Sequence, residues 1–232
     1  KETSHNNVHV VPLGVDHSIF SPTFENKTEK FVILNVGKWE KRKGHDIILE
    51  VFNQAFPQNN DVELWMMCSN PVASKEYNQQ FENYYRQDIR VRLLDRVKTQ
   101  EELADVMKAS SCGFFPSRGE GWNLEVLEMM SCGKPVVTTD YSSHTEFCNA
   151  DNSIAIKPKS LEKAVDDVYF KKEDVGNWAS LDDIKDDFIT ALRSVYAQWL
   201  QGRDITNLEG IKTAHKFNWL NTATKMAEVI NG

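Results

Sequence analysis

Residues 112–139 read CGFFPSRGEGWNLEVLEMMSCGKPVVTT. A short apolar run ends in a loop that contains two glycines, and the loop opens directly into an amphipathic stretch. Gly133-Lys134-Pro135 then separates that stretch from a second apolar run. This succession predicts a strand, a loop, a helix, a turn and a second strand.

The loop between the first strand and the helix has the features of an anion site. Gly119 and Gly121 allow the backbone to approach a ligand closely. The start of the helix adds unpaired N–H groups and the positive end of a helix dipole. Glu120 lies just before the helix and Glu128 about two turns later, so one carboxylate is expected at the loop mouth and the other along the helix.

The rest of the chain extends this alternation of strands and helices. The strand candidates are Val8 to Leu13, Phe31 to Val36, Val62 to Cys68, Ile89 to Leu94, Cys112 to Phe115 and Pro135 to Thr139. The helix candidates between them are His45 to Phe56, Glu76 to Arg86, Glu101 to Ala109, where Thr99 and Glu102 have capping-box spacing, and Leu124 to Ser131. Strict alternation predicts an α/β fold with a doubly wound, Rossmann-like parallel sheet covered by helices on both faces. Helical patterns at Leu161 to Phe170, Asp182 to Leu200 and Leu220 to Ile230 predict a helical tail.

Composition excludes several classes of function. The 232 residues are 41% hydrophobic and 26% charged, as is ordinary for a globular protein. A net charge of −7 argues against a nucleic-acid surface, which is usually basic. No apolar run approaches the roughly 20 residues of a membrane span, and the first residues carry no signal-peptide core. Four cysteines without CxxC pairing favour a reducing, cytoplasmic compartment.

A basic loop follows the strand at Phe31 to Val36. Four of the six residues from Lys38 to Lys43 are basic, and Gly37 and Gly44 frame them. A solvated charged turn and a nucleic-acid patch are the plain alternatives, and the acidic balance of the chain disfavours the second. No GxGxxG is present, which counts against a dinucleotide site. Because ligands of open α/β sheets bind beyond the carboxyl ends of the strands, this loop and the Glu120 loop are expected to share one site.

Together these motifs resemble those of a known family. Glu120-(seven residues)-Glu128 within EGWNLEVLE, followed by SCGKPVV, resembles the donor-site motif of retaining, nucleotide-sugar-dependent glycosyltransferases of the GT-B architecture, and of family 4 in particular. Lys38-(four residues)-Lys43 is similar to the family's Arg-(four residues)-Lys pair, which grips the donor diphosphate. Here Lys replaces the planar, bidentate Arg.

Two further segments are similar to family segments. Leu93-Leu94-Asp95-Arg96-Val97 resembles the stretch whose backbone meets the nucleotide base, although Asp95 stands where glycine is common. Phe217-Asn218-Trp219 resembles the Phe-Ser-Trp before the closing helix, which in the family packs back toward the partner domain. The resemblance runs from Val10 to about Val229 and implies the C-terminal half of a GT-B fold.

The resemblance implies a role for each matching residue. Lys38, Lys43 and Glu120 would be catalytic, with Glu120 facing the donor sugar and Glu128 accepting hydrogen bonds from the ribose hydroxyls. The other implied donor-binding residues are Gly37, Arg96, Val97, Gly121, Trp122, Asn123 and Leu124. No metal or other cofactor is implied, since the metal-holding Asp-x-Asp belongs to the GT-A architecture. The nearest imitation here, Asp61-Val62-Glu63, precedes a strand.

The segment from Tyr141 to Cys148 has two interpretations. His144, Glu146 and Cys148 alternate, so on a strand they would share a face as metal ligands do. Three alternating residues are a weak signal, and we favour a loop beside the donor pocket.

The expected organisation follows from the resemblance. Residues 1–30 would form an interdomain strand and a linker, with the linker at Ser21 to Lys30. Residues 31–180 would form the nucleotide-sugar-binding domain, and residues 181–232 the helices that complete it. The N-terminal acceptor-binding domain would be absent from this chain.

The leading functional hypothesis is the donor-binding domain of a retaining hexosyltransferase. It would take a sugar from a nucleotide-diphosphate sugar and pass it to a glycan, lipid or small-molecule acceptor. Its partners would be the nucleotide sugar and its own N-terminal half, and the isolated domain would be inactive in transfer. The alternatives are a non-catalytic nucleotide-sugar-binding module and an epimerase or phosphorylase relative of the same fold.

Overall fold

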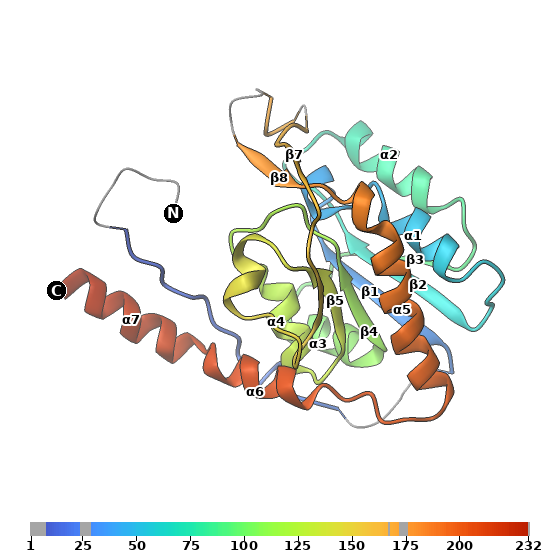
Figure 1. Ribbon diagram of the computed structural model, residues 1–232. Helices are drawn as coiled ribbons and strands as arrows, with labels where there is room; N and C mark the ends of the chain where they lie inside the picture. Colours follow the sequence, from blue (N-terminus) through green and yellow to red (C-terminus); the bar gives the residue numbers. More distant parts are fainter. Residues whose placement is uncertain (1–7, 24–28, 167, 172–175, 232) are drawn as a thin grey trace.

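A six-stranded parallel sheet forms the centre of the molecule (Figure 1). The computed structural model describes residues 8–23, 29–166, 168–171 and 176–231. The strand order is β3-β2-β1-β4-β5-β6. The bounds are β1 Phe31–Gly37, β2 Val62–Cys68, β3 Val91–Leu93, β4 Cys112–Phe115, β5 Val136–Thr139 and β6 Ile154–Ile156. All five neighbouring pairs are parallel, which confirms the doubly wound sheet.

Helices cover both faces of the sheet and enclose two apolar cores. One core packs α1 (Ile48–Ala55), α2 (Lys75–Tyr85) and α5 (Lys185–Leu200) against side chains such as Phe31 and Ile33 of β1. The other packs α3 (Gln100–Ala109), α4 (Leu124–Ser131) and α6 (Leu208–Lys216) around the opposite face, where Leu34 of β1 points. Side chains alternate between the two faces of a strand, so an almost wholly apolar β1 serves both cores.

Several predicted elements have the expected bounds. The helix predicted from Glu101 is α3, and Thr99 and Glu102 form the predicted capping box. The stretch from Asp182 to Leu200 forms the short 3-10 turn η3 (Asp182–Ile184) followed by α5. The last predicted helix is α7 (Trp219–Asn231). The helix predicted from His45 begins at Ile48, after the 3-10 turn η1 (Lys41–Lys43).

Two predicted elements are wrong. Val8 to Leu13 is not a strand, and in this part of the described chain only Val15 makes a bridge, to Asn218. Leu161 to Phe170 is not a helix. It begins with β7 (Leu161–Lys163), which pairs antiparallel with β8 (Asn177–Ala179).

The side chain of Asp166 explains the second error. Its Oδ1 accepts hydrogen bonds from the backbone N–H groups of Val168, Tyr169 and Phe170 at 2.8–3.0 Å. Such a local bond offers the backbone an alternative to the helix ladder.

The predicted linker at Ser21 to Lys30 lies partly outside the described residues.

The two ends of the described chain lie together. α6 packs on α4, and α7 extends away from the sheet beside the N-terminal segment (Figure 1). Besides the bridge between Val15 and Asn218, the Oγ1 of Thr222 donates a hydrogen bond to the carbonyl of Pro12 at 2.8 Å. None of the helices in the described ranges is both long and apolar enough to cross a membrane.

Candidate functional site

A cleft of about 650 Å³ opens at the carboxyl ends of β1, β2 and β3. Its walls come from the ends of these strands, from the basic turn after β1 and from the first turns of α4. The lining residues are Leu13, Val36, Gly37, Lys38, Arg42, Lys43, Met67, Ser69, Pro71, Arg96, Val97, Lys98, Thr99, Gln100, Leu103, Trp122, Asn123, Leu124, Glu125 and Glu128. This is the edge at which an open α/β sheet binds its ligands.

The structure brings nine of the eleven predicted site residues into this lining. They are Gly37, Lys38, Lys43, Arg96, Val97, Trp122, Asn123, Leu124 and Glu128. Glu120 and Gly121 do not line the cleft. They lie on an adjoining hollow with Tyr141 and Trp178, and Arg42 lies on both.

Two glycines allow the basic turn to pack as it does. Gly44 has a φ of 76°, and a Cβ there would lie 2.2 Å from the carbonyl oxygen of Pro116. A Cβ on Gly37 would lie 3.0 Å from the Cδ of Lys43, whose side chain crosses it. A side chain on residue 44 would push the basic turn away from the Glu120 loop, and one on residue 37 would displace the side chain of Lys43.

Glu120 is a buried carboxylate between two cations. Its oxygens lie 2.5 Å from Nη1 of Arg42 and 3.1 Å from Nζ of Lys43, and its side chain is 6% exposed. Ser117 also donates a hydrogen bond to it at 2.9 Å. Burial alone would raise the pKa of Glu120, but the charges of Lys43 and Arg42 outweigh burial and lower it to about 2. Glu120 is therefore ionised at neutral pH.

The sequence interpretation missed the part that Arg42 plays. Besides Glu120, its guanidinium contacts the carboxylate of Glu40 at 2.8 Å and the carbonyl of Gly119 at 2.7 Å. Its place in a run of basic residues hid this, because nothing in that run shows which side chain turns inward.

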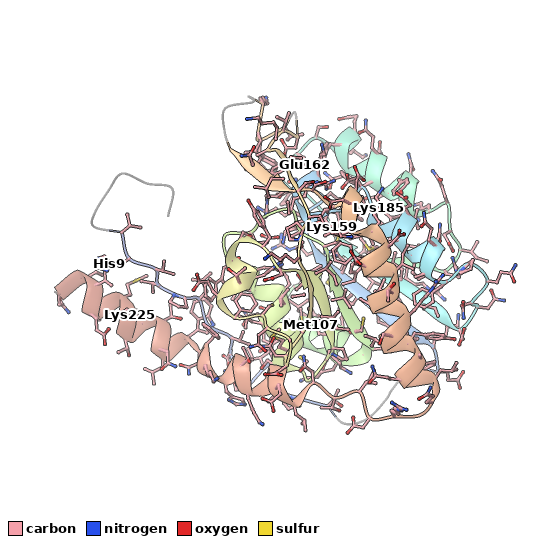
Figure 2. The ribbon with its side chains drawn as sticks, in the orientation of Figure 1. His9, Met107, Lys159, Glu162, Lys185 and Lys225 are labelled. Atoms are coloured by element: carbon pink, nitrogen blue, oxygen red, sulfur yellow. The ribbon has the colours of Figure 1, made fainter. Side chains whose placement is uncertain are left out.

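A second arginine fixes the same loop from its other side. Arg118 has a side chain 3% exposed that forms a bidentate pair with Asp46 at 2.7 and 2.8 Å. Its Nε donates to Glu162 of β7 at 2.5 Å. Figure 2 labels Glu162, which lies at the β7 end of the molecule. The planar fork of Arg suits such a pair, so the Glu120 loop has a rigid anchor.

Glu128 lines the cleft, and its pKa shifts in the direction opposite to that of Glu120. Burial raises its pKa to about 8, and the nearby charge of Glu125 adds to the shift. Among the described residues, none donates a hydrogen bond to its carboxyl group. A ligand with hydroxyl groups would supply the missing partners.

The cleft also presents cations that have no carboxylate partner. Lys43 is shared between Glu120 and Glu125, whose oxygen lies 3.3 Å from Nζ. In contrast, Lys38, Arg96 and Lys98 form no ion pair with any part of the chain that the structure describes, and all three are exposed. This end of the sheet is therefore prepared for an anion, although the whole chain is acidic.

The start of α4 completes the anion-binding character of the cleft. Asn123 precedes the helix with φ 75° and ψ 74°, and its side chain does not cap the helix. Within the described ranges, the N–H groups of Leu124 and Glu125 have no hydrogen-bond acceptor. Free N–H groups and the helix dipole favour a phosphate here.

The alternating His144, Glu146 and Cys148 do not form a metal site. They do not lie on a strand, because the 3-10 turn η2 (Ser142–Glu146) contains the first two. In the described part of the chain, no three side chains of the metal-binding types are grouped for a metal ion. His144 instead contacts Asn123 of the cleft at 2.9 Å, which confirms that this segment lies beside the pocket.

Comparisons with known proteins show a family and a fold that this chain shares. Residues 30–169 match the family model described as "Glycosyl transferases group 1". A D-inositol 3-phosphate glycosyltransferase of Paenarthrobacter aurescens is 25% identical over 194 residues, which are 75% of this chain and 46% of the relative. The chain thus spans about half the length of that relative.

Solved structures show the same fold at low identity. The C-terminal domain of a glycosyl transferase group 1 family protein (LpcC) from Francisella tularensis superposes with a TM-score of 0.66 and 17% identity, over 88% of this chain and 97% of that one. Anabaena Alr3699/HepE in complex with UDP and glucose superposes with a TM-score of 0.67 and 14% identity, over 94% of this chain and 55% of that one.

Proposed function

This chain belongs to the group 1 glycosyl transferases, and on that premise we propose that it is the donor-binding half of a retaining hexosyltransferase. The donor would be a nucleotide-diphosphate sugar. The observation that carries the proposal is the cleft, which combines unpaired cations, a helix N-terminus and a carboxyl group without partners. The cations and the helix N-terminus suit phosphates, and the carboxyl group suits the hydroxyl groups of a ribose or a sugar.

The cations and the helix start would act on the leaving diphosphate. Cleavage of the sugar–phosphate bond builds negative charge on the departing nucleotide. Lys38 and Lys43, with the free N–H groups of Leu124 and Glu125, would stabilise that charge in the transition state. We expect this set to need no metal ion, because it already supplies positive charge where the charge develops.

The two glutamates would serve different parts of the donor. Glu128 would accept hydrogen bonds from the ribose hydroxyls, and its carboxyl group has no competing partner among the described residues. Glu120 would face the sugar, next to Gly121. The backbone from Trp122 to Leu124 would contact sugar and phosphate, and Arg96 and Val97 would border the base.

Retention would follow from attack on the same face that the diphosphate leaves. The acceptor hydroxyl would form the new bond to the anomeric carbon as the bond to phosphate breaks. The leaving phosphate would take the acceptor proton. No side chain of this chain needs to act as a nucleophile.

The acceptor-binding half would be the partner of this chain, and α7 offers a surface for it. Leu220, Met226 and Ile230 of α7 are exposed. Without a second half to close the cleft and orient an acceptor, we expect the isolated chain to bind donor but not transfer sugar. The four cysteines are all buried and free, in keeping with a reducing compartment, and we place the enzyme in the cytoplasm.

Calorimetric titration of the chain with UDP-glucose, GDP-mannose and ADP-glucose in EDTA tests the proposal. At least one should bind, and Lys38→Ala should weaken its binding by removing a cation from the cleft. The change should leave stability intact, because Lys38 forms no ion pair among the residues that the structure describes. Lys212→Ala is the matched control, because Lys212 pairs with Glu209 on the exposed face of α6. Failure of all three sugars to bind, or equal losses in the two variants, would contradict the assignment.

The division of roles has its own test in the complete enzyme. Glu128→Ala should weaken donor binding by about 1.5–3 kcal/mol, the range of a hydrogen bond to a charged group, because the ribose hydroxyls would favour the ionised carboxylate in the complex. Glu120→Ala should chiefly lower the rate of transfer. Small and equal effects of both on turnover would contradict the roles.

A further inference from the structure

Three consecutive residues of η2 form hydrogen bonds to the Glu120 loop. Ser142 accepts a hydrogen bond from the N–H of Glu120 at 2.8 Å. Ser143 donates one to the carbonyl of Trp122 at 2.9 Å. His144 contacts the side chain of Asn123 at 2.9 Å. Segment 142–144 thus runs along the loop and bonds to it at three points.

The contact at Asn123 meets the loop where its backbone is strained. A φ of 75° lies in the left-handed region, which L-residues rarely adopt, and Asn is among the few that tolerate it. This turn directs the chain into α4, so it determines where the free N–H groups of Leu124 and Glu125 point.

The hydrogen-bond network fixes the state of His144. Its Nδ1 lies 2.9 Å from the carbonyl oxygen of Thr139, which can only accept, so Nδ1 carries the proton. Thr138 Oγ1, at 3.1 Å from Nδ1, donates its own hydrogen to the carbonyl of Phe115. The Nε2 lone pair is then free to accept from Nδ2 of Asn123. Burial lowers the pKa of His144, which keeps the ring neutral.

This bond is the only anchor of the Asn123 side chain within the described structure. Its Oδ1 is buried and has no hydrogen-bond donor. Asn123 itself is 6% exposed, so water does not replace a lost partner easily. His144 therefore sets the orientation of the amide.

We propose that His144 is a positioning residue for donor binding: through Asn123 it holds the left-handed turn that aims the N-terminus of α4 at the donor phosphates. This inference rests on the proposed function. His144 does not line the cleft, whereas Asn123 does, so His144 would act through Asn123.

A double-substitution experiment isolates that route. Glycine adopts a positive φ without an anchor, so Asn123→Gly should keep the turn and make His144 dispensable. The tightest of UDP-glucose, GDP-mannose and ADP-glucose is the probe, and calorimetry gives its Kd. His144→Ala should weaken binding about tenfold, the effect of losing about 1.4 kcal/mol of binding free energy. In the Asn123→Gly background, the same change should alter the Kd less than about twofold.

An equal loss in both backgrounds would overturn the proposal, because His144 would then act on the fold as a whole. Thermal unfolding of each variant checks that it is folded. If His144→Ala does not fold, His144→Leu, which also lacks the acceptor, is compared across the same two backgrounds with the same criterion.

Backbone NMR keeps the inference separate from the proposed function. Without any ligand, His144→Ala should shift the amide resonances of Leu124 and Glu125, and should do so far less when residue 123 is glycine. If none of the three sugars binds the unmodified chain, the proposed function fails, and these resonances still decide the positioning role. Unshifted resonances in His144→Ala would refute it.

Discussion

The two glutamates of the EGWNLEVLE motif have the same chemistry but opposite electrostatic surroundings. Glu120 is buried between Arg42 and Lys43 and stays ionised, with a pKa of about 2. Glu128 is half-buried, pairs with no cation among the described residues and is largely protonated in the free protein at neutral pH, with a pKa of about 8. The stability of the free protein should therefore depend on pH in a different way through each of these two carboxyl groups.

Glu128→Gln should stabilise the free protein as the pH rises. The folded pKa of Glu128 exceeds its ordinary value of 4.5, so the folded state binds more protons than the unfolded state between about pH 4.5 and 8. The stability that this group contributes is full below that window and is lost as the pH rises through it, by about 1.4 kcal/mol per unit. Gln imitates the protonated form at every pH.

Melting temperatures of the unmodified protein and Glu128→Gln at pH 5 and pH 8 measure the effect. The variant should gain on the parent at pH 8 relative to pH 5, and it should also bind the donor more weakly. A constant difference between the two pH values would show that Glu128 does not titrate in this window.

Arg42→Ala should destabilise the fold strongly. Of the two cations that pair with the buried carboxylate of Glu120 in the described structure, it leaves only Lys43, and breaking a buried ion pair typically costs about 3–5 kcal/mol. Arg86→Ala is the control, because Arg86 pairs with Glu82 across an exposed helix surface. That change should stay within about 0.5 kcal/mol. Urea denaturation of both variants gives the comparison, and similar midpoints would contradict the buried role of Arg42.

At the scale of elements, two helix caps allow an effect on stability to be distinguished from an effect on donor binding. Thr99 caps α3 at the edge of the cleft, and Ser74 caps α2, where its Oγ accepts from the N–H of Tyr77 and it does not line the cleft. Replacing either by alanine should cost about 0.5–2 kcal/mol of stability.

Only Thr99→Ala should also weaken nucleotide-sugar binding. Thr99→Ala removes the acceptor of the Glu102 N–H and so weakens the capping box, whose other half, Glu102 Oε2, holds the N–H groups of Lys98 and Thr99. The loop that carries Arg96 and Lys98 should then loosen, whereas the loop before α2 contributes no cation to the cleft. Thermal melts and calorimetry on both variants are the measurements. A binding loss in Ser74→Ala as large as in Thr99→Ala would show that affinity simply follows stability.

Local patterns predicted the elements whose causes are local. The alternation of apolar runs and helical stretches gave the parallel sheet, and the spacing of Thr99 and Glu102 gave the start of α3. The predicted helix from Leu161 failed because a single carboxylate, Asp166, captured three backbone N–H groups. β6 and α6 were not predicted at all: β6 has only three residues, and α6 lies in a largely polar stretch.

The site divides in the same way. Residues that belong to a contiguous motif, such as Trp122 and Leu124, could be placed from the sequence. The contacts of Arg42 with Glu120 and of His144 with Asn123 join positions 78 and 21 residues apart. Which side chains meet at such distances depends on how the strands are ordered in the sheet, which no local pattern records.

At the scale of the whole molecule, the charge of the cleft differs in sign from the net charge of the chain. The chain has a net charge of −7, yet Lys38, Arg96 and Lys98 gather at one edge of the sheet and form no ion pair with the residues that the structure describes. Donor affinity should therefore fall as salt rises, because exposed cations are screened within about 10 Å at 0.1 M. Titrations at 50 and 500 mM NaCl measure this, and Lys38→Ala should show a smaller dependence. An affinity independent of salt would contradict the claim that these cations bind the donor phosphates.

The strand order also has a kinetic consequence. β1 aligns with β2 over seven residue pairs, but with β4 over only two, Ile33 with Cys112 and Leu34 with Gly113. β2 follows β1 closely in sequence, whereas β4 lies beyond two further helices. Closing a longer loop costs more entropy, so the sheet should grow first as β1–β2–β3 and accept β4 late. The basic turn belongs to the early half and the Glu120 loop to the late half. During refolding, the ability to bind a nucleotide should thus appear after most of the secondary structure has formed.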